Sequence, residues 1–289
     1  MSATVDVAIR FGYLADGYHG VQIQPDVRTV QAELERALRR RSWLGRNEHI
    51  ALSSRTDAGV RVVMNGARLR LAEDIWATVG PDRMRHALQE GTPADLHVHD
   101  LMLAPEGWRP RYASHRTYRY RMEMLEHWTS IPLHDQTFER ILMMFEGRHD
   151  FTNFARLEEG NDPIRRVLHC RPWVANGRIV GFEIRGEAFL WNMIRRIAAA
   201  VDGILRHRWS EAHVHRALHR PHDAVDMGVA DAGPLLLWDV TWPDLPQMST
   251  DPKLLFSSNG TEAWQPWRLR AERELDLLVI DAWADLHPA

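Results

Sequence analysis

Short stretches of alternating apolar and polar residues, separated by only a few residues, constrain the fold of this chain most strongly. Val5, Val7, Ile9 and Phe11 alternate with Asp6 and other neighbours, which is the period of a half-buried strand. Similar patterns along the first half predict a helix at 29–41 capped by Thr29, strands at 50–53 and 67–71, a helix at 81–90, and an extended segment at 96–103. Strands this close leave no room for parallel crossovers throughout, so we expect an α+β fold with antiparallel pairs.

The second half repeats this style. Tyr118 and Tyr120 alternate with polar residues over 117–123, so the two tyrosines share one face of a predicted strand. The other predicted elements are a helix at 137–145, strands at 167–174 and 179–185 with Pro172 at an edge or strand end, a helix at 192–205 with Met193, Ile197, Ala200 and Ile204 inward, a helix at 210–218 capped by Ser210, and a strand at 235–240.

These elements predict three regions. Residues 1–104 form an N-terminal half with the candidate catalytic loop, and residues 105–243 form a second, pseudo-equivalent half. We expect each half to be a mostly antiparallel sheet with helices on one face, the two sheets being joined around a central basic cleft. Residues 244–289 begin as a linker rich in Pro, Ser and Gly and continue with helical spacing, at a net charge of −4. They predict an appended acidic helix.

Composition excludes several classes of protein. The chain is 45% hydrophobic and 26% charged, an ordinary globular balance. It contains no run of about 18 uncharged apolar residues, so no transmembrane helix is expected. The one cysteine, Cys170, excludes an internal disulfide and favours a cytoplasmic protein. The sixteen histidines include no His-Glu-x-x-His pattern, and we predict no metal or other cofactor.

Arginine dominates the basic residues. Lys253 is the only lysine, and the formal net charge is −3. A genome-wide preference for arginine would explain this, although arginine also binds phosphate in a bidentate manner and stacks on bases. Residues 105–121 carry a local charge of +4, which is the pattern of an RNA-binding groove or of a solvated face.

The segment from Arg55 to Val60 is the most informative part of the chain. Asp57 lies in a predicted turn, with Arg55 two positions before it and Gly59 two positions after it. A neighbouring arginine favours an ionised carboxylate, as a nucleophile or base requires, and glycine lets the backbone turn sharply beside a ligand. Taken alone, the pattern is more often that of an Asx-turn with a surface arginine, since functional pairs of this kind are a small minority.

The wider context resembles one family. The string from Ser53 to Val60 resembles the active-site motif of the tRNA pseudouridine synthase A family. Further similar segments follow in the family's order: 20–25 and 28–31 before the first helix, 111–113 and 116–120 in its tyrosine strand, 150–154 and 164–167 in its second half, and 189–197 in its long buried helix. The resemblance covers roughly residues 5–243.

The resemblance implies a uridine isomerase. The uridine N-glycosidic bond is cleaved, the uracil turns, and it is rejoined through carbon 5, without any cofactor. Asp57 is the implied catalytic nucleophile or base, Arg195 its basic partner, and Tyr118 the residue that stacks on the uracil. The residues implied in substrate or RNA binding are Arg55, Arg111, Arg116, Arg119 and Phe189. The implied substrate is the anticodon stem-loop of tRNA, bound by a homodimer.

The chain departs from the family pattern at four places. The family usually has tryptophan and arginine where this chain has Val21 and Ile23, glycine where it has Ser54, and histidine where it has Arg61. Two alternatives therefore stay open. One is the same chemistry on a different RNA or on a free nucleotide, and the other is a non-catalytic RNA-binding or folding protein.

Overall fold

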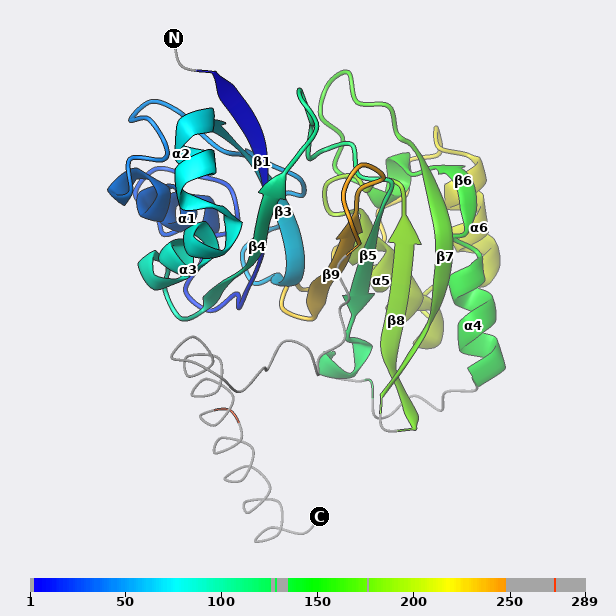
Figure 1. Cartoon of the computed structure of the whole chain (residues 1–289). Helices are drawn as coiled ribbons and strands as arrows, with labels where there is room; N and C mark the ends of the chain where they lie inside the picture. Colours follow the sequence, from blue (N-terminus) through cyan, green and yellow to red (C-terminus); the bar gives the residue numbers. More distant parts are fainter. Residues whose placement is uncertain (1–2, 126–127, 129–134, 176, 248–272, 274–289) are drawn as a thin grey trace, which may run out of the picture.

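Nine strands form one continuous sheet in the computed structural model, which describes residues 3–125, 128, 135–175, 177–247 and 273 (Figure 1). The first half contributes β1 (Thr4–Tyr13), α1 (Val30–Arg40), β2 (Ala51–Leu52), β3 (Arg61–Ala72), α2 (Glu73–Val79), α3 (Pro81–Gly91) and β4 (Leu96–Leu103). The second half contributes β5 (His115–Tyr120), the 3-10 turn η1 (Met122–Met124), α4 (Asp135–Met143), β6 (Gly147–Asp150), the 3-10 turn η3 (Thr152–Phe154), β7 (Ile164–Ala175), β8 (Arg178–Gly186), α5 (Met193–Leu205), α6 (Glu211–His219) and β9 (Leu235–Thr241).

The last strand joins the two halves. The strand order is β4-β1-β3-β9-β5-β8-β7-β6, with β2 paired to β3. β9 pairs with β5 in antiparallel fashion and with β3 in parallel fashion, through Arg61 opposite Leu236 and Val62 opposite Leu237. The remaining strand pairs are antiparallel. The α+β fold with a mostly antiparallel sheet is therefore confirmed, whereas the division into two pseudo-equivalent domains stays a prediction.

Each half of the chain places its own helices beside its own strands of the sheet. α1, α2 and α3 lie together beside β1, β3 and β4, and α4, α5 and α6 lie beside the strands of the second half (Figure 1). Leu34 and Leu38 of α1 and Ile197 and Val201 of α5 are fully buried. None of the described helices has the length and apolarity needed to cross a bilayer.

Local signals for the helix ends are confirmed. The Thr29 side chain accepts a hydrogen bond from the Ala32 amide at the start of α1, and Ser210 does the same for His213 at the start of α6. The α5 stripe that begins at Met193 is buried as expected. Pro172 lies in β7 beyond the four residues that pair with β6. At this position β8 is the one described strand that pairs with β7, so the missing N–H of Pro172 lies at a sheet edge of the described structure.

Several elements differ from the sequence prediction. β3 begins at Arg61 rather than at 67, and the short strand β6 was not predicted. The strand predicted over 117–123 ends at Tyr120, because Arg121 bends away, donates its amide to Pro234 O at 3.0 Å, and is followed by η1. The helix α2 was not predicted, since none of its residues is buried and it therefore carries no apolar stripe. The predicted linker and acidic helix of 244–289 lie outside the described residues, except for 244–247 and Arg273.

Candidate active site

The loop that carries Asp57 follows the short strand β2 and is held from both sides. The Ser54 amide donates to Asn65 Oδ1 of β3 at 3.2 Å, and the Asn65 amide nitrogen donates back to Ser54 O at 2.9 Å. On the other side, the Val21 amide donates to Thr56 O at 3.2 Å. Gly20, at φ +91°, lies so close that a Cβ there would be 3.0 Å from the same oxygen. The predicted turn is thus fixed by non-local contacts.

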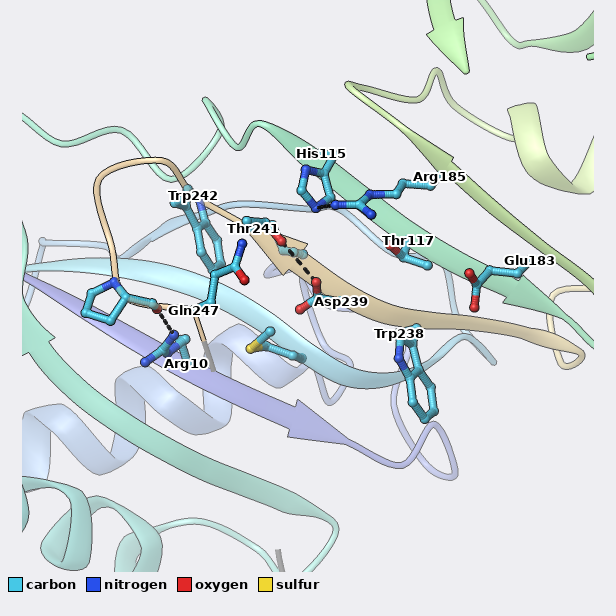
Figure 2. Close-up of a pocket in the computed structure, with 13 residues that line it drawn as sticks. Arg10, His115, Thr117, Glu183, Arg185, Trp238, Asp239, Thr241, Trp242 and Gln247 are labelled. Carbon is cyan, nitrogen blue, oxygen red and sulfur yellow. Dashed lines mark hydrogen bonds between the residues drawn. The ribbon is translucent and has the colours of Figure 1, made fainter. Parts of the chain in front are cut away.

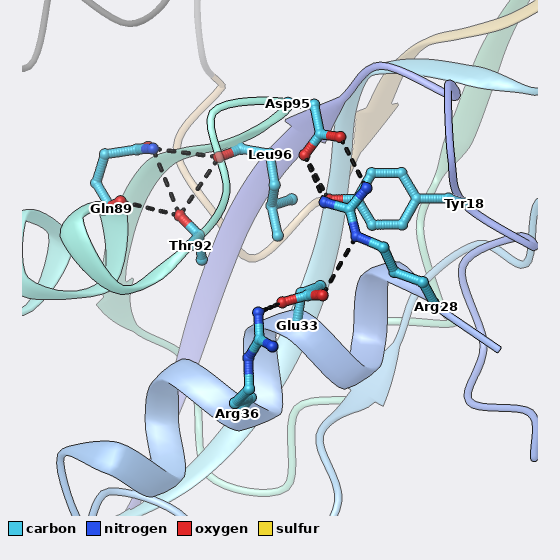
Figure 3. A network of polar contacts seen from close by, with 8 residues as sticks. All are labelled: Tyr18, Arg28, Glu33, Arg36, Gln89, Thr92, Asp95 and Leu96. Atoms are coloured by element: carbon cyan, nitrogen blue, oxygen red, sulfur yellow. Dashed lines mark hydrogen bonds and ion pairs between the residues drawn. The ribbon is translucent and has the colours of Figure 1, made fainter. Parts of the chain in front are cut away.

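A polar network holds the segment that supports this loop. Figure 3 shows the Arg28 guanidinium donating to both carboxylate oxygens of Asp95 at 3.0 Å while it lies over the Tyr18 ring, 4.1 Å from the centroid. The Tyr18 hydroxyl donates to Asp95 at 2.7 Å, and Arg28 also pairs with Glu33 of α1. Residues 18–28 are thereby tied to α1 and to the turn before β4.

Arg195 from the first turn of α5 contacts Asp57, although 138 positions separate them in sequence. Arg195 Nη1 donates to Asp57 Oδ2 at 2.9 Å and to Asn192 Oδ1 at 3.1 Å, and Arg195 Nε donates to Ala230 O at 2.8 Å. The Asp57 side chain is 36% exposed and that of Arg195 is 20% exposed. The carboxylate is therefore accessible to a ligand while a guanidinium holds one of its oxygens.

Tyr118 of β5 lies near this pair. It is buried, and its ring meets that of Phe189 edge to face at 5.3 Å between centroids. Burial raises the pKa of Tyr118. The neighbouring Arg116 and a hydrogen bond with Ser54 oppose this increase, and the nearby charge of Asp57 adds to it. Tyr118 is consequently a neutral phenol at physiological pH.

Arg116 is buried beside these residues and is fully engaged by the protein. Arg116 Nε donates to Ser54 Oγ at 3.0 Å, Nη1 to Glu187 O at 2.8 Å, and Nη2 to Arg111 O at 2.8 Å. Burial lowers the pKa of Arg116 below its ordinary value. The guanidinium thus links three loops around the site, and its implied contact with RNA stays a prediction.

The other predicted binding residues are not all brought together. The Arg55 and Arg111 side chains are exposed near the candidate site. Arg119 lies on the opposite face of β5 from Tyr118, where it donates to Glu183 at 2.8 Å and lies 3.7 Å from the Trp238 ring centroid. The structure therefore separates Arg119 from Asp57.

A polar pocket occupies that opposite face. Figure 2 shows His115 and Thr117 of β5 with Glu183 and Arg185 of β8 along its lining. Burial and the adjacent Arg185 lower the pKa of His115. Because side chains alternate along a strand, these residues point away from the side of β5 that bears Tyr118. No group of three or more His, Cys, Asp or Glu suited to a metal ion occurs among the described residues.

The four departures from the family pattern have distinct positions. Val21 is fully buried, and Ile23 is 37% exposed. Ser54 is buried, and its hydroxyl accepts the bond from Arg116. Arg61 donates to Gly233 O at 2.8 Å, which ties β3 to the loop before β9.

Sequence reasoning missed two partners of Arg195. Asn192 precedes a helix, where asparagine is ordinarily interpreted as a cap, and its spacing of three residues from Arg195 allows either a cap or a side-chain contact. The second partner is the backbone carbonyl of Ala230, which no side-chain pattern could identify. The Ala230 contact depends on the folding of the loop before β9 against α5.

Comparison with known proteins agrees with the resemblance. A family model described as tRNA pseudouridine synthase matches residues 141–243. Proteins named tRNA pseudouridine synthase A are similar over most of the chain. The one from Methanoculleus marisnigri is 35% identical (82% of this chain, 83% of the relative), that from Thermococcus gammatolerans 33% (86% and 89%), and that from Geobacillus kaustophilus 30% (79% and 92%). A chain in the crystal structure of a Cbf5-Nop10-Gar1 complex is 14% identical over 68% of this chain and 44% of its own length, with a TM-score of 0.34. On the strength of the full-length relatives, the chain belongs to the tRNA pseudouridine synthase A family.

Proposed function

We propose that this protein converts uridine to pseudouridine in tRNA, with Asp57 as the catalytic carboxylate. The main observation that supports this site is the hydrogen bond from Arg195 Nη1 to Asp57 Oδ2. Two residues remote in sequence meet there, beside a buried tyrosine and at a partly exposed carboxylate. Family membership supports the reaction, and this geometry supports the residues.

The reaction is an isomerisation whose atoms balance within the substrate. The bond from ribose C1′ to uracil N1 breaks, and a bond from C1′ to uracil C5 forms. C5 loses a proton and N1 gains one, so no oxidant, reductant or water is consumed. Asp57 acts on the uridine as nucleophile or base, and Arg195 holds the carboxylate in place through its hydrogen bond to Oδ2.

The aromatic pair supplies the surface for the base. Tyr118 packs against the uracil, and Phe189 supports the Tyr118 ring through its edge-to-face contact. Since the phenol is neutral, it adds no negative charge beside Asp57. The target nucleotide must leave its stack to reach this carboxylate, as for other enzymes that act on a base within folded nucleic acid.

The RNA contacts come from arginines around the site. Arg55 and Arg111 are exposed and suited to phosphate, whereas Arg116 acts by holding the loops on which the substrate rests. Arg119 would bind RNA only if the substrate reached the opposite face of β5. We further propose the tRNA anticodon stem-loop as the substrate, a homodimer as the active species, and a cytoplasmic location.

The function is tested with an in vitro tRNA transcript that carries tritium at uridine C5. Release of tritium measures proton loss from that carbon. We expect Asp57→Asn to lower the rate by at least about 100-fold, because the amide can act neither as a nucleophile nor as a base. Asp226→Asn is the matched control, since Asp226 is 78% exposed and pairs with Arg196 of the same helix as Arg195. Wild-type rates from the Asp57 variant would remove Asp57 from the mechanism.

The same chemistry on another RNA is the second candidate. Ile23 is 37% exposed at a position where the family usually has a cation, so one RNA contact is replaced by an apolar group. Mapping pseudouridine in total RNA with and without the gene distinguishes the two. Sites lost only outside tRNA would favour this second candidate over the first.

A further inference from the structure

Asn192 occupies an unusual backbone conformation at the start of α5. Its φ is +62° and its ψ is 5°, in the left-handed region that few residues other than glycine adopt. Asparagine tolerates this region better than most residues, so backbone geometry alone would account for its presence. Its side chain, however, makes a contact that the backbone does not require.

The Asn192 side chain does not cap its own helix. An asparagine at this position ordinarily accepts a bond from an amide in the first helical turn, and here no such bond forms. Asn192 Oδ1 instead accepts from Arg195 Nη1 at 3.1 Å. The chain thus uses a strained residue and gives up a cap in order to contact Arg195, and strain of this kind is common at functional sites.

This contact determines where Arg195 points. Nη1 carries two hydrogens, of which one is directed to Asn192 Oδ1 and the other to Asp57 Oδ2. Ala230 O holds Nε at 2.8 Å and anchors the near end of the guanidinium. Removing the Asn192 amide would leave Nη1 held only by Asp57, so that the guanidinium could swing about its Nε anchor and away from the carboxylate.

We propose that Asn192 is a positioning residue that aims Arg195 at Asp57. The proposal rests on the proposed function only in its effect on rate, because the geometry it describes is independent of the substrate. It predicts that the amide, and not the left-handed backbone, accounts for asparagine at position 192.

Asn192→Gly separates these two explanations. Glycine adopts φ +62° without strain, so a purely conformational role predicts wild-type behaviour. We expect kcat to fall by about tenfold, because a hydrogen bond to a charged group is lost, with KM for tRNA unchanged. Asn192→Asp retains an acceptor oxygen and should recover part of the lost rate. His207→Gly is the matched control, since His207 is exposed at φ 56° just beyond the other end of the same helix.

A second readout does not depend on activity. In a crystal structure of Asn192→Gly we expect Arg195 Nη1 to leave hydrogen-bonding distance of Asp57 Oδ2. In an Arg195→Lys background, the Asn192→Gly substitution should change kcat by less than about twofold, because the bond it removes is already absent. An unmoved Arg195 contact, or an equal loss of kcat in both backgrounds, overturns the proposal. If wild-type protein makes no pseudouridine while Arg195 still moves in the variant, the proposed function fails and the positioning role stands.

Discussion

Replacing Arg116 with methionine should destabilise the whole molecule. Arg116 is 7% exposed and donates to Ser54 Oγ, Glu187 O and Arg111 O at 3.0, 2.8 and 2.8 Å. Each bond to a charged donor contributes about 1.5–3 kcal/mol, but water can replace the donor at the carbonyls nearest the surface. We therefore expect a loss of about 3–5 kcal/mol, equivalent to about two such bonds. For a chain of this size the melting temperature should fall by roughly 6–20 °C.

Two measurements decide whether Arg116 is structural. Thermal and urea unfolding give the loss of stability, and tRNA binding at several salt concentrations gives the number of phosphate contacts. A side chain that contacts phosphate lowers the slope of log K against log salt by about one when it is removed. We expect the slope to be unchanged in Arg116→Met and reduced in Arg111→Met, whose side chain is exposed. A loss of stability below about 1 kcal/mol together with a reduced slope for Arg116→Met would refute the reasoning.

Three further predictions concern packing, the polar network and pH. Gly181→Ala would place a Cβ 1.9 Å from Tyr120 O, so we expect urea unfolding to show a loss of about 3 kcal/mol or more in the free energy of unfolding. Near-wild-type stability would contradict so close an approach of the two backbones. Tyr18→Phe removes the hydroxyl bound to Asp95 and should lower the free energy of unfolding by about 1–2 kcal/mol, whereas an unchanged urea midpoint would show that this bond contributes nothing. Burial lowers the pKa of His99 below its ordinary 6.5. The contribution of neutral His99 to the free energy of unfolding is therefore complete above pH 6.5, and it is lost as the pH falls through the lower pKa of the folded state. The urea midpoint should therefore drop below about pH 6.5, and less steeply in His99→Gln; parallel pH profiles for the two proteins would exclude His99 as the cause.

Periodicity was enough to predict most secondary structure. Strands such as β4, at 96–103, have one buried face and can be recognised by alternation, and α5 carries a continuous apolar stripe. Thr29 and Ser210 marked helix starts because capping is a contact between residues three apart. α2 was missed because it buries none of its residues.

The candidate site was only partly predictable. Asp57, Tyr118 and Arg195 could be named through motif resemblance, but no spacing in the sequence indicates that Arg195 Nη1 meets Asp57 Oδ2. Alternation along the predicted strand already placed Arg119 on the face opposite Tyr118, and the structure adds its partner there, Glu183. Arg116 looked like its exposed neighbours in sequence, yet the structure buries it.

The sequence alone determined many local features of this protein: most of its helices and strands, and the caps of α1 and α6. These depend on residues within about one or two turns of each other, where apolar periodicity and side-chain capping act directly. Tertiary structure decided the rest, namely that β9 joins β3 to β5, that Arg195 meets Asp57 and Ala230 O, and that Arg116 is buried. Those outcomes depend on which segments pack together, and a buried polar group is stable only where distant backbone and side chains supply its partners.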